Sequence, residues 1–245
     1  MSRKYQNPPV IEAVCEFHLM PDVNWDITIP GLLYEKLRTR FPTKGRVVIQ
    51  ENQIVSSPQG VEQQTTNREL VRFLSPDQKT FIQLGEKILT IHCLPPYPTW
   101  TNFQPLIQEV FNSFISIVSI SDFERIGLRY INKIDLPLDN LNLEEYFLYR
   151  PFTGPSLPGR FSNFIIAGLF SYDGDLDLCR IQFSDLHSDS PYGHFIIDLD
   201  YFSKTPGSIN KDTAIPWIEK AHANLESAFE ACITDQLRDK FQEIK

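Results

Sequence analysis

The segment Val10–Leu19, with the sequence VIEAVCEFHL, decides the fold class of this 245-residue chain. Apolar side chains occupy every second position of the segment, at Ile11, Ala13, Cys15, Phe17 and Leu19. A period of two predicts a β-strand with one face in the core and the other toward solvent. The preceding Asn7-Pro8-Pro9 is extended and cannot join a ladder, so we expect the strand to begin directly after it.

A second alternating segment, Phe123–Ile134, restarts the pattern halfway along the chain. The pattern of residues 1–120 further predicts two helices, at Gly31–Phe41 and Thr101–Ser119. It predicts four more strands, at Arg46–Gln50, Glu69–Leu74, Thr80–Leu84 and Ile88–Leu94. Residues 51–67 are expected to form a polar loop or irregular edge. The pattern of residues 121–245 predicts a short helix at Leu143–Leu148 and a final helix at Ile215–Phe241. Between them it predicts strands at Arg160–Phe170, Leu176–Ser184 and His194–Phe202, with a tight hairpin at Asp173-Gly174. Thr99 or Thr101 and Thr213 are the expected helix N-caps.

The order of these elements predicts an α+β fold in a single domain of residues 1–245. Two pseudo-symmetric halves, 1–120 and 121–245, would form one curved antiparallel sheet with the long helices packed on one face. This outline is similar to the helix-grip and TATA-binding-protein folds, a likeness of architecture and not of function.

Composition narrows the class of protein. A hydrophobic content of 42% suffices for a sizeable core, and neither a signal sequence nor an apolar run long enough to cross a bilayer is visible. Four dispersed cysteines inside apolar segments are expected to be reduced core thiols, namely Cys15, Cys93, Cys179 and Cys232. We therefore expect a cytoplasmic protein without a membrane partner. The net charge of −8 makes general nucleic-acid binding unlikely.

Charged residues form stripes on the polar faces of the two alternating segments. Glu12 and Glu16 lie on the first, and Arg125, Arg129 and Lys133 lie on the second. If the opening strands of the two halves are neighbours, opposite charges can pair across them. We expect Glu12 or Glu16 within ion-pair distance of Arg125 or Arg129. The stripes are then either a groove that binds a partner or a salt-bridged, solvated sheet surface.

Two further groups of side chains are candidate sites. Tyr97 and Trp100 flank a proline-rich turn and form either a recognition patch or a packed turn. The densest set of potential metal ligands is Asp185, His187, Asp189, Asp198 and Asp200. Its spacing matches no calcium-loop motif, and a polar hairpin without metal gives the same composition.

Three segments together resemble a known family: NPPVIEAVCEF at 7–17, PPYPTW at 95–100 and RIGLRYINKI at 125–134. The family is a sporadically distributed prokaryotic group of proteins of about this length with no assigned activity. The resemblance implies no catalytic residue and no cofactor. A patchy distribution implies an accessory role in a defence-type or mobile gene system.

The favoured hypothesis for function is a non-enzymatic binding protein with no cofactor, whose partner is another protein. The acidic window 173–200, with seven aspartates and one arginine, suggests a basic partner. One alternative is a metal-dependent enzyme at the Asp/His-rich 185–200 region. Another is a nucleic-acid binder that uses the sheet face and the cations of Lys36–Arg46.

Overall fold

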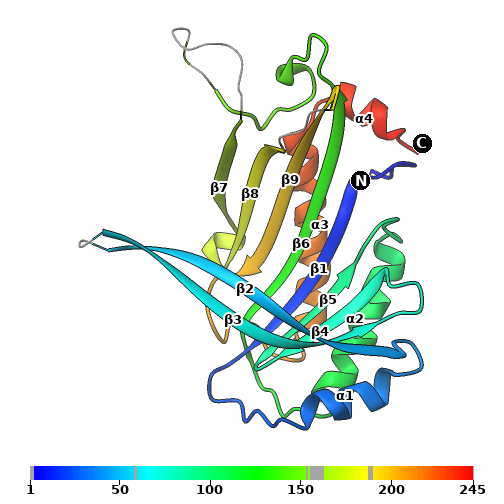
Figure 1. Cartoon of the computed structure of the whole chain (residues 1–245), viewed down its shortest axis with the longest axis vertical. Coiled ribbons are helices and arrows are strands. Elements are labelled where there is room, and N and C mark those ends of the chain that lie inside the picture. Colours follow the sequence, from blue (N-terminus) through cyan, green and yellow to red (C-terminus); the bar gives the residue numbers. More distant parts are fainter. Residues whose placement is uncertain (1–2, 58–59, 153, 155–162, 187–189, 245) are drawn as a thin grey trace.

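The described residues form one open antiparallel sheet of nine strands together with helices (Figure 1). The structure is a computed structural model that describes residues 3–57, 60–152, 154, 163–186 and 190–244, without the side chains of 49–68. The strand order is β2-β3-β4-β5-β1-β6-β9-β8-β7. The strands are β1 (Val10–Leu19), β2 (Thr43–Ser57), β3 (Gly60–Leu74), β4 (Thr80–Gly85), β5 (Ile88–Cys93), β6 (Phe123–Pro137), β7 (Ile165–Tyr172), β8 (Asp177–Leu186) and β9 (Tyr192–Ser203).

Helices α2 and α3 lie behind the sheet in the view of Figure 1, so that this view looks onto the opposite face. The helices are α1 (Ile29–Leu37), α2 (Trp100–Ile115), α3 (Ala214–Cys232) and α4 (Asp235–Phe241), with short 3₁₀ turns η1 (Leu143–Glu145) and η2 (Asp173–Asp175). The apolar stripes of α2 and α3 and the apolar faces of the strands enclose one continuous core. This confirms the α+β class and the antiparallel sheet.

The two alternating segments that decide the fold are neighbours at the centre of the sheet. β1 pairs antiparallel with β6, with Cys15 opposite Leu128 and Phe17 opposite Ile126. All four of these side chains are fully buried. The apolar positions of the alternating segments are therefore buried on one face of the sheet, as expected. The polar positions between them turn toward the other face.

The segment 51–67, predicted as a loop or irregular edge, is instead the outer part of a long hairpin of β2 and β3. The two strands pair from Thr43 with Leu74 to Ser57 with Gly60, whereas β3 pairs with β4 only over Val71–Leu74. Most of the hairpin thus extends beyond the sheet as an arm, which Figure 1 shows in front of the other strands. Such strands cover no core and need no apolar alternation, so the period of two is absent.

The final helix, predicted as one element, is divided into α3 and α4. The backbone at Ile233 is extended, and the Cys232 carbonyl accepts from the N–H of Leu148, 2.8 Å away, so helical hydrogen bonding stops there. Thr234 caps α4 by accepting from the Leu237 N–H. Both helices bury apolar residues in the same core, which explains why helical spacing continues across the break.

Other local predictions need smaller corrections. The side chains of Thr99 and Thr213, at the N-cap positions of α2 and α3, make no capping hydrogen bond. The hairpin at Asp173-Gly174 exists, but its connection is wider than a two-residue turn, because the ladder closes with Tyr172 opposite Asp177. Part of the predicted strand Arg160–Phe170 lies outside the described residues.

In the part of the chain that the structure describes, none of the helices combines the length and apolarity needed to cross a bilayer.

Candidate functional site

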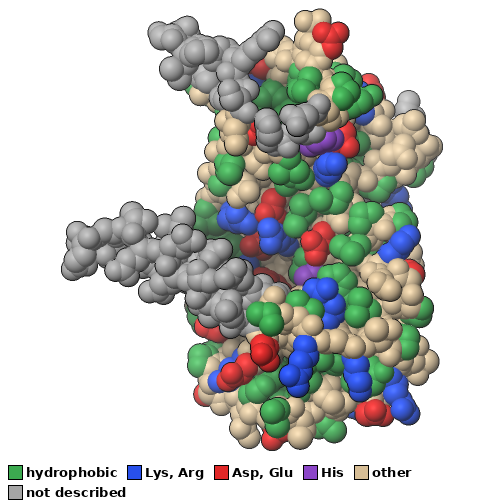
Figure 2. Space-filling view, in the orientation of Figure 1, with side chains coloured by type: hydrophobic (Ala, Val, Ile, Leu, Met, Phe, Trp, Pro, Cys, Tyr) green, Lys and Arg blue, Asp and Glu red, His purple; other side chains and the backbone are tan. Residues whose placement is uncertain are grey.

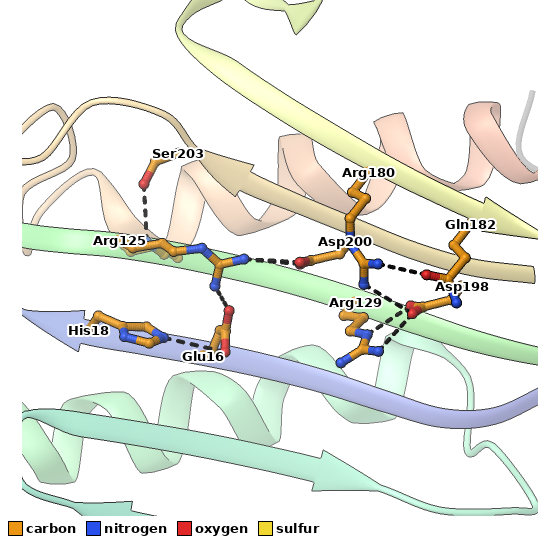
Figure 3. A network of polar contacts seen from close by, with 10 residues as sticks. Glu16, His18, Arg125, Arg129, Arg180, Gln182, Asp198, Asp200 and Ser203 are labelled. Carbon is orange, nitrogen blue, oxygen red and sulfur yellow. Dashed lines mark hydrogen bonds and ion pairs between the residues drawn. The ribbon is translucent and has the colours of Figure 1, made fainter. Parts of the chain in front are cut away.

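The candidate site is the outer face, defined here as the sheet face opposite α2 and α3. Polar side chains from β1, β6, β8 and β9 meet on it in a row of ion pairs (Figure 3). Figure 2 shows blue and red side chains gathered at the middle of this face. Antiparallel pairing aligns the charged positions across strands, with His18 opposite Arg125 and Arg129 opposite Asp200.

The first part of the row is centred on Arg125. Its guanidinium forms an ion pair with Glu16 through Nη1 and donates through Nη2 to both oxygens of Asp200, at 3.1 and 3.2 Å. It also lies over the ring of Phe202, 4.4 Å from the centroid. The expected ion pair between the acidic and basic stripes is therefore confirmed.

Gly127 has no side chain, which leaves room for the ion pair of Glu16 and Arg125. A Cβ built at that position would come within 2.8 Å of Glu16 Oε1 and 3.0 Å of Arg125 Nη1. The carboxylate and guanidinium thus lie directly against bare backbone, which keeps both close to the sheet.

The second part of the row is centred on Asp198. Arg129 donates to its carboxylate through Nε and Nη2, at 2.7 and 2.6 Å, in the bidentate geometry that makes such pairs strong. Arg180 donates to the same carboxylate from 3.2 Å and to Gln182 Oε1 from 3.0 Å. One carboxylate therefore holds two guanidinium groups in fixed orientations.

The two parts act on each other electrostatically. Burial lowers the pKa of Arg125, and the nearby positive charges of Arg129 and Arg180 lower it further, while Asp200 opposes the change. The hydrogen bonds that Arg129 donates to Asp198 raise the pKa of Arg129, and the negative charge of Asp200 raises it further. Three guanidinium groups are thus close enough to repel one another, and the carboxylates below them balance that repulsion.

The acids and bases of the row differ in depth. The side chains of Asp198 and Asp200 are 6% and 16% exposed, whereas those of Arg129 and Arg180 are 40% and 36% exposed. The carboxylates form a buried layer, and the guanidinium groups form the layer that solvent meets. The accessible charge in this part of the outer face is therefore positive.

The remaining stripe residues flank the row. Glu12 pairs with His92 on β5 at 2.8 Å, and His92 stacks on Phe81, which in turn lies under Arg72. At the other end, Lys133 lies 3.5 Å from Asp135. His194 also contacts Asp135, at 2.6 Å. The outer face is therefore charged from β3 to β9.

A hollow of about 600 Å³ opens beside the row, where the arm of β2 and β3 leaves the sheet. It is lined by His18, Leu19, Pro21, Glu69, Leu70, Glu86, Lys87, Ile88 and Glu124. The hollow is partly enclosed and partly open to solvent.

Tyr97 and Trp100 do not join the outer face. The Tyr97 hydroxyl lies 3.0 Å from that of Tyr130, which lies 3.1 Å from His222 Nδ1 on α3. Trp100 stacks on the His222 ring at 4.1 Å between centroids and donates to Glu219. The proline-rich turn thus packs against α3 on the helix side of the sheet, which is the packed-turn interpretation.

The predicted metal cluster is divided between the two faces of the sheet. Asp185 lies opposite Phe195 on the core side and accepts from the Phe164 N–H at 2.6 Å, whereas Asp198 and Asp200 lie on the outer face. His187 and Asp189 lie outside the described residues. Within the described residues, no group of three or more His, Cys, Asp or Glu side chains could hold a metal ion. The physical reason is the period of two, which sends neighbouring strand positions to opposite faces.

The acidic window 173–200 does not form one surface either. Asp177 is buried on the helix side and accepts from Tyr201, Trp217 and Lys220, while Asp173 pairs with Lys220. Asp177 therefore joins β8 to α3 and is buried, whereas the exposed Asp173 lies in η2.

The cations of Lys36–Arg46 have local contacts near α1. Arg38 pairs with Glu35 on the same helix, Arg40 pairs with Glu109 on α2, and Lys44 lies over the Tyr34 ring. These three contacts hold the side chains against residues of α1 and α2.

Sequence reasoning missed Arg180, Gln182 and His92 as members of the outer face. Their alternation within predicted strands would have placed them on the polar side, but only the strand order brings β8 and β5 to the site. Neither a protein-family model nor a curated protein matches this chain.

Proposed function

We propose that this chain is a non-enzymatic binding protein that holds an acidic segment of a partner protein against Arg129 and Arg180 on the outer face. The observation that supports this most directly is the layering of charge, with guanidinium groups exposed above buried carboxylates. An acidic partner replaces the basic one suggested by composition, because five aspartates of 173–200 contact residues of this chain, namely Asp173, Asp177, Asp185, Asp198 and Asp200.

The arginines are prepared for binding by the contacts that hold them. A guanidinium group has five N–H donors, and Arg129 and Arg180 each direct two of them to the partners described above. Both side chains are oriented before any ligand arrives, so an incoming carboxylate meets donors that need little further ordering. A broad face, rather than an enclosed pocket, favours a macromolecular segment as the ligand.

The proposal extends to two finer statements about the chain. The strand order places the opening strands of residues 1–120 and 121–245 side by side, which supports a pseudo-repeat of two halves with a helix-grip-like outline. The three motifs support membership of the sporadic prokaryotic family and an accessory role in a defence-type or mobile gene system. Co-purification from the host, with identification of the bound protein, tests that role.

The experiment uses a glutamate-rich decapeptide as the probe and a lysine-rich decapeptide as its counterpart, with binding measured by fluorescence anisotropy. The variant combines Arg129→Gln, Arg180→Gln and Asp198→Asn, so that no buried carboxylate is left unpaired. We expect the acidic probe to bind the native chain and to lose affinity at least about tenfold with the variant.

The control is Arg38→Gln with Arg40→Gln, which removes two ion-paired arginines away from the outer face. This control lowers the net charge more than the test variant does. If it weakens binding equally, total charge explains the interaction and the site is wrong. Preference for the lysine-rich probe would also contradict the proposal.

A further inference from the structure

Strand β7 forms an exposed edge of the sheet, and its structure has consequences beyond the outer face. Of the described strands it pairs only with β8, so that within the described residues the other side of its backbone has no strand partner for its N–H and C=O groups. Figure 1 shows β7 at the side of the sheet with α3 behind the strands farther in.

The exposed side chains of β7 are large and apolar. Ile165, Leu169 and Phe170 are 68%, 59% and 41% exposed. The strand has the sequence IIAGLFSY, without a charge and without a proline. Natural edge strands are usually protected by lysine, proline, a bulge or short length, and this eight-residue strand has a regular register with β8. An edge of this kind is expected to be covered in solution.

The side chains of β7 are complementary to those of a second copy of β7 that runs antiparallel to it. Ile165, Ala167, Leu169 and Ser171 turn to the outer face, so that large and small residues alternate. An antiparallel copy centred on Gly168 sets Ile165 opposite Ser171 and Leu169 opposite Ala167, large against small in every pair. On the helix side, the same register sets Ile166 opposite Phe170.

We propose that β7 pairs with β7 of a second copy of this chain, in a two-fold dimer centred on Gly168. The uncharged strand brings no like charges together and has no charge with which to select a different partner. The two sheets become one continuous sheet, and the helices of both copies lie on the same side. Because the contact is isologous, it closes after two copies.

Gly168 suits the axis of this dimer. The Phe170 ring lies over it, with ring atoms 2.8 and 3.0 Å from a Cβ built there, and the Tyr149 hydroxyl is 3.2 Å away. The aromatic ring thus covers the glycine on the helix side and leaves the backbone edge open for close approach of a second strand.

The size of the contact sets its strength. At roughly 200 Å² for a large exposed side chain, the three exposed residues and the strand edge offer about 400 Å² per copy, half of a standard interface. We therefore expect a weak, reversible dimer, as for other interfaces below the standard size.

The first test is sedimentation velocity of the full chain over a range of concentrations, with Leu169→Lys as the variant. We expect a monomer–dimer equilibrium in the native chain and at least a tenfold weaker one in the variant, with unchanged circular dichroism. The matched control is Val48→Lys, because Val48 is 61% exposed on β2 at the opposite edge. It should leave the dimer intact.

Three outcomes would overturn the proposal. The first is a native chain that stays monomeric at every concentration up to about 100 μM. The second is a dimer that tolerates Leu169→Lys. The third is open-ended growth that both lysine variants abolish, which would indicate head-to-tail pairing of β7 with β2. Each of these results leaves Arg129 and Arg180 of the single chain in place, so the decapeptide assay tests the acidic-segment proposal separately.

The second test measures the register. All four native cysteines are buried, so Ile165→Cys with Ser171→Cys introduces the accessible thiols. Within one strand these positions are about 20 Å apart and cannot form a disulfide, whereas across the proposed dimer they are opposite each other. We expect a covalent dimer on mild oxidation of the double variant and much less from either single variant. Equal cross-linking of the single variants would contradict the register.

Discussion

The replacement Asp198→Asn tests whether the ion-pair row is a buried structural unit. The Asp198 side chain is 6% exposed and accepts three hydrogen bonds, two from Arg129 and one from Arg180. Removal of one partner from a fully buried ion pair costs about 3–5 kcal/mol, because the remaining charge is uncompensated. Both arginines are more than a third exposed and can turn toward water, so we expect a smaller loss of about 2–3 kcal/mol.

The assay is urea unfolding followed by circular dichroism. With a slope near 3 kcal/mol per molar urea, the midpoint should fall by about 1 M at unchanged slope. The control is Asp135→Asn, because Asp135 contacts Lys133 and His194 but is 50% exposed. That change should cost no more than about 0.5 kcal/mol.

A double-mutant cycle with Arg129→Gln completes the test. If the pair is coupled as its geometry indicates, the double variant is more stable than the sum of the single effects predicts, by about 1–2 kcal/mol. The reasoning is refuted if Asp198→Asn costs no more than Asp135→Asn. Such a result would mean that the ion pairs of the row are solvated and weakly held. Arg129 and Arg180 would then have no fixed orientation for binding a partner.

Three further predictions concern the rest of the chain. Trp217→Phe removes the indole that donates to buried Asp177 at 2.9 Å and should cost about 1–3 kcal/mol in urea unfolding, whereas Trp100→Phe, whose partner is exposed, should cost less. Burial raises the pKa of the Cys232 thiol to about 12, so a disulfide reagent at about pH 8 should label the native chain slowly and all four thiols after unfolding. Hydrogen bonds from the Ser75 hydroxyl and the Lys79 N–H lower the pKa of Asp77 in the folded chain. The ionised Asp77 therefore stabilises the fold above its unfolded-state pKa, and this stabilisation is lost as the pH falls through the folded-state pKa. Asp77→Asn should destabilise the chain at neutral pH and not at about pH 2.

The core strands could be predicted closely because alternation reports burial of one face. β1 has the expected bounds, and β4 and β5 differ from the prediction by one residue at one end. The arm of β2 and β3 could not be predicted in this way, since its outer part is paired to no third strand. Its strands are determined by pairing with each other, which leaves no signal of period two.

The candidate site was predictable only where a single strand pair determines it. Glu16 and Arg125 pair because the two opening strands are neighbours, which the order of elements suggested. Asp198 was assigned to a metal cluster with Asp185, because the two are close in sequence across one hairpin. Only the register shows that they point to opposite faces, and register depends on long-range pairing.

The two proposals combine in one geometric consequence. A two-fold axis through Gly168 and perpendicular to the sheet turns both outer faces to the same side of the dimer. Arg180 on β8 is opposite Leu169, so the two copies of Arg180 would be three strand spacings apart across the sheet and two residues apart along it, about 16 Å in all. A single acidic segment of a few residues spans that distance, and the second contact then forms within one complex at high effective concentration. In the proposed dimer, pairing at β7 would thus place two copies of each exposed arginine on one surface, where one acidic segment could contact both.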